Sequence, residues 1–479
     1  MKVVVANPPW PGEGYGTRSN IRWPHRRGDK VLTYPVYLAY TVSVLKKDGF
    51  QTKGIDAVDK EWGISEFVEQ IKEMKPDAIL LEVSTPSINF DFETAHKLKE
   101  AMPNLFIVLC GPHVSYFHQS VIDNYRFVNA CIRGEFDYAM RDICRALRDK
   151  RDLKSVDGIT YRKGSKTIVN KEREKIANLD DLPFPDREDF KLDSYQQAFF
   201  HGDRYALVIS SRGCPFRCTF CLWPNSLFGH AFRARSAKNV VDEIEYLIKE
   251  HNIDGVYFDD DTFAINKKRV HDICDEIKKR GLKFYWCCMG RVDTIDEEML
   301  KDMKSAGCYE IFYGFESGSD KILNSVNKGI NKEQMRKAVK ITQQAGLVAS
   351  GSFIFGLPGD SHKTVKQTLD FAKSLGADYV QFVLAAPFPG SKMYEEAMEK
   401  GLIKINSWSD FDGSCGPIMK TENLSREELG GIIRKAYISY YTAPRVVWSN
   451  LKKIRGFDDM KRIFRGARSV LSRIVYYKK

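Results

Sequence analysis

Short apolar runs alternate with amphipathic helical stretches along the first 145 residues of the chain. Each apolar run ends in glycine, proline or polar residues, as buried strands do. The runs that predict strands cover residues 2–9, 51–57, 77–84, 105–112 and 130–135. Helical patterns at 35–48, 64–75 and 91–102 separate them. This alternation predicts an α/β domain with a doubly wound parallel sheet, in which ligands bind at the carboxyl ends of the strands.

A second series of strand and helix patterns begins near residue 201. Its strands are expected near 205–210, 254–259, 283–288, 309–315, 348–356 and 379–385. Six parallel units of this kind predict a partial (β/α)6 barrel, again with its chemistry at the carboxyl ends of the strands. The expected organisation is a domain at 1–145, a linker at 146–200, the barrel at 201–395 and a small α-helical C-terminal region at 396–479, with a helix at 425–441.

Composition places the chain among globular proteins, with 43% hydrophobic and 29% charged residues. No run of eighteen apolar residues occurs and the N-terminus lacks a signal-peptide pattern, so we expect a cytoplasmic protein. Cysteines in such a setting are more often reduced thiols or metal ligands than disulfides. The net charge of +11 is concentrated at the C-terminus, because residues 445–479 hold eleven Lys and Arg against two Asp, a net +9.

Three of the eleven cysteines fall within eight positions, in the stretch SRGCPFRCTFCLWP. Cys214, Cys218 and Cys221 directly follow the first strand of the second series. Structural zinc requires four ligands, and His230 is the nearest candidate for a fourth. A [4Fe–4S] cluster held by only three cysteines instead leaves one iron open for another ligand. The spacing therefore favours the cluster over zinc.

A C-x3-C-x2-C motif after the first strand of a partial barrel resembles the radical S-adenosylmethionine (SAM) enzymes. The resemblance implies that the open iron binds SAM and that an electron from the cluster cleaves it to a 5′-deoxyadenosyl radical. It also implies a flavodoxin- or ferredoxin-type reductant. The cofactor carries the difficult chemistry, and the protein positions it.

Further motifs in the same order suggest residues that bind SAM. Asp259 and Asp260 end the second strand and suit the SAM amino group, although capping of the next helix is the alternative for the neighbouring Asp261. Arg291 ends the third strand, where a guanidinium can hold a carboxylate. Glu316 ends the fourth strand and resembles the ligand of the ribose hydroxyls in this family.

Cysteines on the predicted barrel strands form a separate candidate group. By strand alternation one of Cys287 and Cys288 must face inward. An inward thiol could donate a hydrogen atom to a product radical, and Cys288 is the candidate for this catalytic role. A buried core thiol is the more common alternative.

Ahead of a radical SAM barrel, the first domain resembles the flavodoxin-like B12-binding domain, which implies bound cobalamin. The matching loops hold Ser84, Thr85 and Ser87 in one case and Gly111, Pro112 and Ser115 in the other. The Asp-x-His-x-x-Gly motif that supplies a cobalt ligand in other B12 proteins is absent, since residues 56–63 contain no histidine. A domain that no longer binds cobalamin is the alternative. The aromatic, basic loop at 7–28 is either a lid or a solvated loop.

The stretch CTFCLWPNSLFGHAFRARS resembles a narrower group, the hopanoid-associated radical SAM proteins of the HpnJ type and the archaeal calditol synthases. This resemblance implies a cyclitol ether synthase that contracts a lipid-linked sugar, such as glucosamine on bacteriohopanetetrol, to a cyclopentane polyol. The alternatives are a cobalamin-dependent radical methyltransferase or an oxidative cyclase acting on a lipid or tetrapyrrole, and a cluster protein without catalysis.

The C-terminal tail suggests where the enzyme meets such a substrate. Apolar residues recur every three to four positions across 446–475, with Lys and Arg between them. A basic amphipathic helix suits an anionic membrane surface, so we expect a peripheral membrane protein. A helix packed on the body is the alternative. Nucleic acid is not expected as a partner, because no strand-rich appendix follows the barrel.

Overall fold

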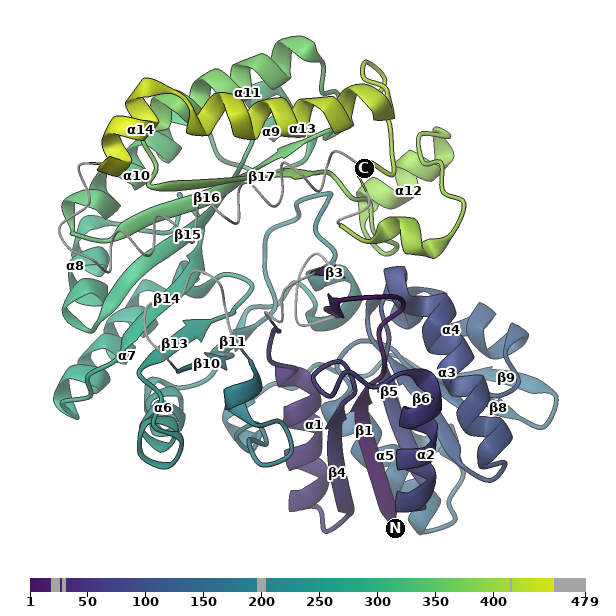
Figure 1. Cartoon of the computed structure of the whole chain (residues 1–479). Coiled ribbons are helices and arrows are strands. Elements are labelled where there is room, and N and C mark those ends of the chain that lie inside the picture. Colours follow the sequence, from purple (N-terminus) through teal and green to yellow (C-terminus); the bar gives the residue numbers. More distant parts are fainter. Residues whose placement is uncertain (19–25, 28–31, 196–203, 414–415, 452–479) are drawn as a thin grey trace.

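The structure is a computed structural model, and it describes residues 1–18, 26–27, 32–195, 204–413 and 416–451. Two sheets organise the chain, one in each half (Figure 1). The first has the strand order β4-β1-β5-β6-β7-β8-β9. Its strands are β1 (Lys2–Asn7), β4 (Gln51–Asp56), β5 (Ala78–Glu82), β6 (Phe106–Cys110), β7 (Ala130–Ile132), β8 (Ile159–Lys163) and β9 (Lys166–Val169). Its first five strands in that order run parallel, as expected.

Helices cover both faces of this sheet, which explains why its central strands are apolar runs rather than alternating ones. The helices are α1 (Val36–Lys47), α2 (Ile64–Met74), α3 (Ile88–Ala101), α4 (Pro112–Asn124) and α5 (Asp137–Arg148). One apolar cluster joins α2, α3 and α4 to one face, and α1 and α5 pack on the other. The first domain is therefore doubly wound, as the sequence predicts.

The hairpin of β8 and β9 falls within 146–200, the expected linker. It pairs antiparallel with β7 and extends the first sheet by two strands. The sheet thus reaches beyond residue 145, the expected boundary, because the edge strand β7 offers unpaired backbone groups that a following hairpin can satisfy.

The second sheet is a parallel partial barrel with the order β10-β13-β14-β15-β16-β17. Its strands are β10 (Tyr205–Val208), β13 (Gly255–Phe258), β14 (Tyr285–Gly290), β15 (Cys308–Glu316), β16 (Val348–Phe355) and β17 (Tyr379–Leu384). The connecting helices are α6 (Ala237–His251), α7 (Lys267–Lys279), α8 (Glu297–Ser305), α9 (Asp320–Ser325), α10 (Lys332–Gln344) and α11 (His362–Leu375). Side chains of Ser, Asn or Asp cap the N-termini of α6, α7, α8, α10 and α11.

The C-terminal region is helical, with α12 (Lys392–Glu399), α13 (Arg426–Tyr441) and α14 (Pro444–Leu451). Most of the basic tail, from residue 452 on, lies outside the described residues. Within the part of the chain that is described, no helix is both long and apolar enough to cross a membrane.

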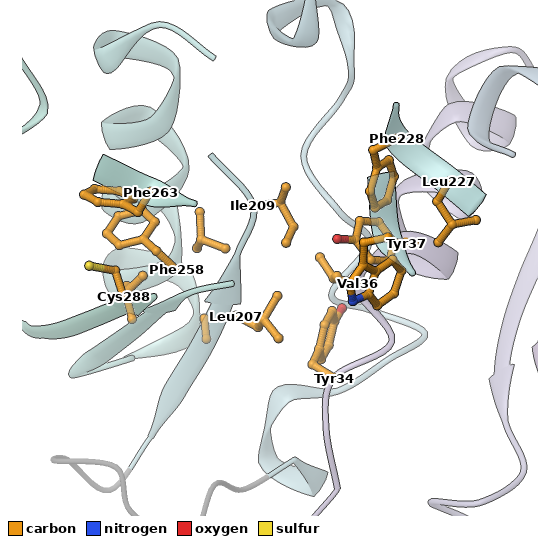
Figure 2. Packing of buried hydrophobic residues seen from close by; sticks show 14 of the residues in the cluster. Tyr34, Val36, Tyr37, Leu207, Ile209, Leu227, Phe228, Phe258, Phe263 and Cys288 are labelled. Atoms are coloured by element: carbon orange, nitrogen blue, oxygen red, sulfur yellow. The ribbon is translucent and has the colours of Figure 1, made fainter. Parts of the chain in front are cut away.

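One apolar cluster runs through both halves of the molecule. Figure 2 shows Tyr34, Val36 and Tyr37, at and before the start of α1, facing Leu207 and Ile209 from the barrel side. The rings of Tyr37 and Phe228 are 4.9 Å apart. The first domain and the barrel are therefore packed together rather than joined by a free linker.

Candidate active site

The three clustered cysteines lie on a loop that leaves and re-enters a short two-stranded ribbon. The ribbon consists of β11 (Ser211–Arg212) and β12 (Arg233–Ala234), which pair antiparallel. Gly213 begins the loop with φ +84°, and a Cβ there would lie 2.2 Å from the Ala231 carbonyl oxygen. Only glycine fits this turn, because it combines a left-handed conformation with a close backbone approach.

Burial dominates the chemistry of the loop thiols. It raises the pKa of Cys221 to about 12, and it raises that of Cys218 while the positive charges of Lys328 and Arg291 act in the opposite direction. The ten cysteines in the described residues are all free of disulfides. The loop thiols are thus available as ligands, and a metal would stabilise the thiolate form that burial disfavours.

The donor set fits an iron–sulfur cluster better than a single ion. Across the described ranges, no group of three or more His, Cys, Asp or Glu is arranged to hold one metal ion. A cluster does not need that arrangement, because each thiolate binds a different iron. His230 is also engaged at both ring nitrogens, with the Cys214 carbonyl and with the Asn225 side chain, each at 3.1 Å. The structure therefore gives no support to His230 as a fourth zinc ligand.

Glu316 ends β15 beside the cysteine loop, in a buried ion pair that the sequence did not reveal. Its Oε1 accepts a hydrogen bond from Lys328 Nζ at 2.6 Å, and both side chains are less than a tenth exposed. Burial by itself lowers the pKa of Lys328, but Glu316 and Cys218 more than offset this, so the pKa lies above its ordinary value. A Cβ on Gly314 would lie 2.3 Å from Glu316 Oε1, so the pair depends on that glycine.

Arg291 lies directly after β14 and reaches the same place. Its Nη1 is 4.0 Å from Cys218 Sγ, and its guanidinium lies 3.5 Å from the centre of the Phe216 ring. Two further contacts hold it, a bidentate pair with Asp293 at 3.0 Å and a bond to the Lys328 carbonyl at 2.8 Å. Arg291 thus lies next to the cysteine loop, as predicted, but in this structure its guanidinium already binds the Asp293 carboxylate.

The three aspartates after β13 divide into different roles. Asp260 is fully buried, and its carboxylate accepts bonds from the backbone of Ser210 and Ser211, at 2.7 and 3.0 Å, and from the Ser210 hydroxyl. It therefore braces the end of β10 rather than facing a ligand. Asp261 accepts from Gly213 N at 3.1 Å and so supports the cysteine loop. The alternative role of Asp261, capping of the next helix, does not hold, because Asn266 caps α7.

Asp259 is the aspartate of the three that lies by the barrel interior. Burial is the main cause of the strongly raised pKa of the Cys287 thiol, followed by the charge of Glu310, and the nearby charge of Asp259 also raises it. Asp259, Arg291 and Glu316 follow or end the neighbouring strands β13, β14 and β15, at the edge where the cysteine loop lies. This arrangement fits the amino, carboxylate and ribose groups expected of SAM.

The structure gives no support to Cys288 as the catalytic thiol. Its side chain is 1% exposed and belongs to the apolar core, where Figure 2 shows it beside Phe258 and Phe263. Trp286, two residues earlier on the same face, is also fully buried. Cys287 lies on the opposite face of the strand and is close to Glu310 and Asp259. Alternation correctly predicts that one thiol of the pair faces inward, and it is Cys287.

The predicted cobalamin loops lie at the carboxyl ends of β5 and β6. Ser84, Thr85 and Ser87 are buried and paired within the protein, Ser84 with Ser87 at 2.8 Å and Thr85 with His113 at 3.2 Å. Their side chains thus fix the loop, and any ligand would meet its backbone.

In the second loop Gly111 has φ +116° and precedes Pro112, and the Ser115 hydroxyl accepts from Gly134 N at 3.1 Å. These small residues suit a bulky ligand at the sheet edge.

The loop after β4 has an apolar residue where a cobalt-ligating histidine would stand. Val58 stands where the histidine of the Asp-x-His motif would lie, and it is 5% exposed in the apolar core. Asp56 is buried and bonds to Asn7 at 2.8 Å and to Tyr195 at 3.0 Å. If cobalamin binds, this loop supplies no cobalt ligand.

The described start of the N-terminal loop is anchored by two buried side chains. The Arg18 side chain is fully buried and pairs with Asp91 at 2.7 Å, and its guanidinium lies 5.2 Å from the Trp10 ring centre. Trp10 itself is 7% exposed. The loop is therefore anchored at Trp10 and Arg18, while residues 12–14 between them are exposed, and residues 19–25 and 28–31 lie outside the described residues.

Comparisons with known proteins agree with this geometry. Residues 208–372 match the family described as the Radical SAM superfamily, and residues 30–144 match the B12 binding domain. An uncharacterised methyltransferase of Pyrococcus horikoshii is 34% identical over 97% of this chain and 98% of its own length. The anaerobic magnesium-protoporphyrin IX monomethyl ester cyclase of Rubrivivax gelatinosus is 28% identical, over 92% of this chain and 77% of its own.

Solved structures share the fold at low sequence identity. The radical SAM methyltransferase TsrM of Kitasatospora setae, solved with cobalamin and a [4Fe–4S] cluster, superposes with a TM-score of 0.71, at 14% identity, over 99% of this chain and 98% of that chain. The cobalamin-dependent SAM radical enzyme OxsB gives a TM-score of 0.74 at 19% identity, over 99% and 71%. From its two domains, its cysteine loop and its full-length relative, the chain belongs to the cobalamin-dependent radical SAM enzymes, whose cofactors are a [4Fe–4S] cluster, SAM and cobalamin.

Proposed function

We propose that this protein is a methyltransferase that adds a methyl group to a carbon atom of a lipid or tetrapyrrole. When bound, the cluster supplies the electron that cleaves SAM, and cobalamin carries the methyl group. The 34% identical relative, which spans nearly all of both chains, has a methyltransferase name, and this favours methyl transfer over cyclisation.

The single observation that most supports this proposal is the position of the cysteine loop between the two domains. On one side Arg291 approaches Cys218 from the end of β14. On the other side the turn Pro224–Phe228, just after Cys221, packs against α4 of the first domain. One substrate held at this loop could therefore meet the chemistry of both cofactors, as methyl transfer requires.

The residues of this chain then have distinct roles. Cys214, Cys218 and Cys221 would hold the cluster, and Asp259, Arg291 and Glu316 would hold SAM. Lys328 holds and orients the Glu316 carboxylate through their 2.6 Å contact. Asp260 and Asp261 brace the turn from which the cysteine loop departs.

The products formed from SAM test this proposal. The reconstituted protein, given SAM, cobalamin and a low-potential reductant, is expected to form both S-adenosylhomocysteine and 5′-deoxyadenosine, because one SAM donates a methyl group and another is cleaved. Mass spectrometry of the nucleosides measures both. Formation of 5′-deoxyadenosine without S-adenosylhomocysteine would contradict methyl transfer and favour a cyclase or a ring-contracting enzyme.

Ring contraction of a lipid-linked sugar is the second candidate, and contact with a membrane is proposed for either reaction on a lipid. In α14, Val447 is 41% and Trp448 62% exposed. The sequence that follows, 452–479, carries ten Lys and Arg against two Asp. Exposed apolar side chains beside concentrated positive charge support docking on an anionic membrane surface.

A further inference from the structure

A buried group of four charged side chains connects the base of the cysteine loop to the first domain. We call it the ion cluster, and it consists of Arg212, Arg233, Glu135 and Asp137. The two arginines stand opposite each other in the ribbon of β11 and β12. All three loop cysteines lie between them in sequence, so the loop leaves and returns through this pair.

Each arginine forms a bidentate ion pair with one carboxylate of the first domain. Arg212 donates to the two oxygens of Asp137 at 2.7 and 3.2 Å. Arg233 donates to the two oxygens of Glu135 at 2.8 and 3.2 Å. Arg212 Nη1 is also 3.5 Å from Glu135 Oε1, which links the two pairs. Both carboxylates belong to the segment between β7 and α5, because Glu135 follows β7 and Asp137 begins α5.

The first domain also encloses Arg212 with aromatic rings. The Arg212 guanidinium lies 5.2 Å from the centre of Tyr40 and 5.6 Å from that of Tyr37, both on α1. None of the four ionic side chains is more than 9% exposed. Burial by itself raises the pKa of Glu135, but Arg212 and Arg233 more than offset this and bring it below its ordinary value. The four side chains therefore form two linked, buried ion pairs that depend on one another.

Buried bidentate pairs fix orientation, whereas apolar contacts only favour proximity. The apolar core around Tyr37 and Phe228 brings the two halves together without specifying the angle of the ribbon. Two forks on opposite strands of one ribbon define both its position and its rotation. We propose that the ion cluster positions the cysteine loop relative to the first domain. An iron–sulfur cluster bound to the loop would then keep a fixed position relative to that domain. The members of the ion cluster are positioning residues and not catalytic ones.

Charge-removing variants of the two carboxylates test this inference against a matched control. Glu135→Gln and Asp137→Asn keep the shape of each side chain and remove one buried charge. Glu243→Gln is the control, because Glu243 is equally buried and also pairs with two arginines, Arg187 at 3.1 Å and Arg235 at 2.5 Å, but on α6. The reconstituted holoprotein is used, and iron release to a chelator and the electron paramagnetic resonance spectrum of the reduced cluster are measured.

We expect Glu135→Gln and Asp137→Asn to release iron at least about tenfold faster than the wild type and to change the spectrum, since one broken buried pair is a large perturbation. Glu243→Gln should release iron at close to the wild-type rate. If Glu135→Gln does not fold, Asp137→Asn decides alone. Wild-type iron release and spectrum in the Glu135 and Asp137 variants, or equally fast release in Glu243→Gln, would overturn the inference. The assay requires only the iron–sulfur cluster, so its result is independent of which reaction the enzyme catalyses.

Discussion

At the scale of single residues, the buried Lys328 explains the unusual end of β15. Glu316 adopts φ +63°, which a non-glycine residue rarely does, and the register with β16 shifts between Gly314 and Glu316. The 2.6 Å pair with Lys328 supplies the interaction that offsets this strained conformation. A carboxylate held in place by a buried partner at the edge of the cysteine loop suits a rigid SAM site.

Replacing Lys328 with methionine should therefore destabilise the protein and weaken SAM binding. Lys328→Met leaves Glu316 buried without its partner, and breaking a buried pair in this way costs about 3–5 kcal/mol of the free energy of unfolding. Urea unfolding and a SAM titration measure the two effects. Lys321→Met on the exposed face of α9 is the control and should change neither. A Lys328 variant as stable as the control would show that the pair contributes nothing to stability.

At the scale of elements, α13 protects the free edge of the barrel. β17 is the last strand of its sheet, and its unpaired backbone groups would invite pairing with another chain. Tyr437 on α13 donates to the Phe382 carbonyl at 2.9 Å, and its hydroxyl accepts from the Phe382 N–H at 3.1 Å. Tyr441 donates to the Val380 carbonyl at 2.8 Å. The helix predicted at 425–441 thus acts as a cover for the edge.

Tyr437→Phe should lower the free energy of unfolding by about 1–3 kcal/mol, because it leaves a buried donor and acceptor of the strand unsatisfied. Tyr441→Phe should cost less, since Tyr441 is only partly buried and contacts one carbonyl. Chemical denaturation of both variants measures the difference. The opposite order, or no loss in Tyr437→Phe, would mean that packing rather than these hydrogen bonds seals the edge.

The periodic signals in the sequence are local, and they predict the elements well. The expected strand at 51–57 is β4 (Gln51–Asp56), and that at 379–385 is β17 (Tyr379–Leu384). Contacts between residues that are distant in the sequence cannot be predicted from such local signals. Alternation separates Cys287 from Cys288 but cannot say which one faces the core, and nothing local marks Lys328 as the partner of Glu316. The pairing of the β8–β9 hairpin with the first sheet was not predicted for the same reason, because the place of the hairpin is set by the edge of β7.

At the scale of the whole molecule, one continuous core and the ion cluster make the two domains a single unit around the cysteine loop. The C-terminal region also contacts the first domain, since the ring of Trp408 lies 5.1 Å from that of His113 beside the predicted cobalamin loops. The basic tail is the part of the chain to which the described structure assigns no role.

Deleting residues 452–479 should abolish salt-sensitive binding to vesicles that contain anionic lipid. The deletion removes a net charge of +8, and each basic residue near such a surface contributes about 1 kcal/mol, screened by salt. Vesicle sedimentation at low and high salt measures the loss. Formation of 5′-deoxyadenosine without substrate should be unchanged, because every residue assigned to the cluster and SAM remains. Undiminished vesicle binding, or unfolding of the truncated protein, would contradict the membrane role.

The most direct test of the whole account is the cleavage of SAM by cysteine variants under reducing conditions. Cys214→Ala, Cys218→Ala and Cys221→Ala should each lose the cluster absorbance and form no 5′-deoxyadenosine, because each removes one of three ligands. Cys144→Ala, which alters a buried thiol on α5 far from the loop in sequence, should keep both. Nucleoside analysis of the four variants and the wild type is expected to show 5′-deoxyadenosine only in the wild type and Cys144→Ala. A fully active variant at position 214, 218 or 221 would contradict the assignment of the cluster.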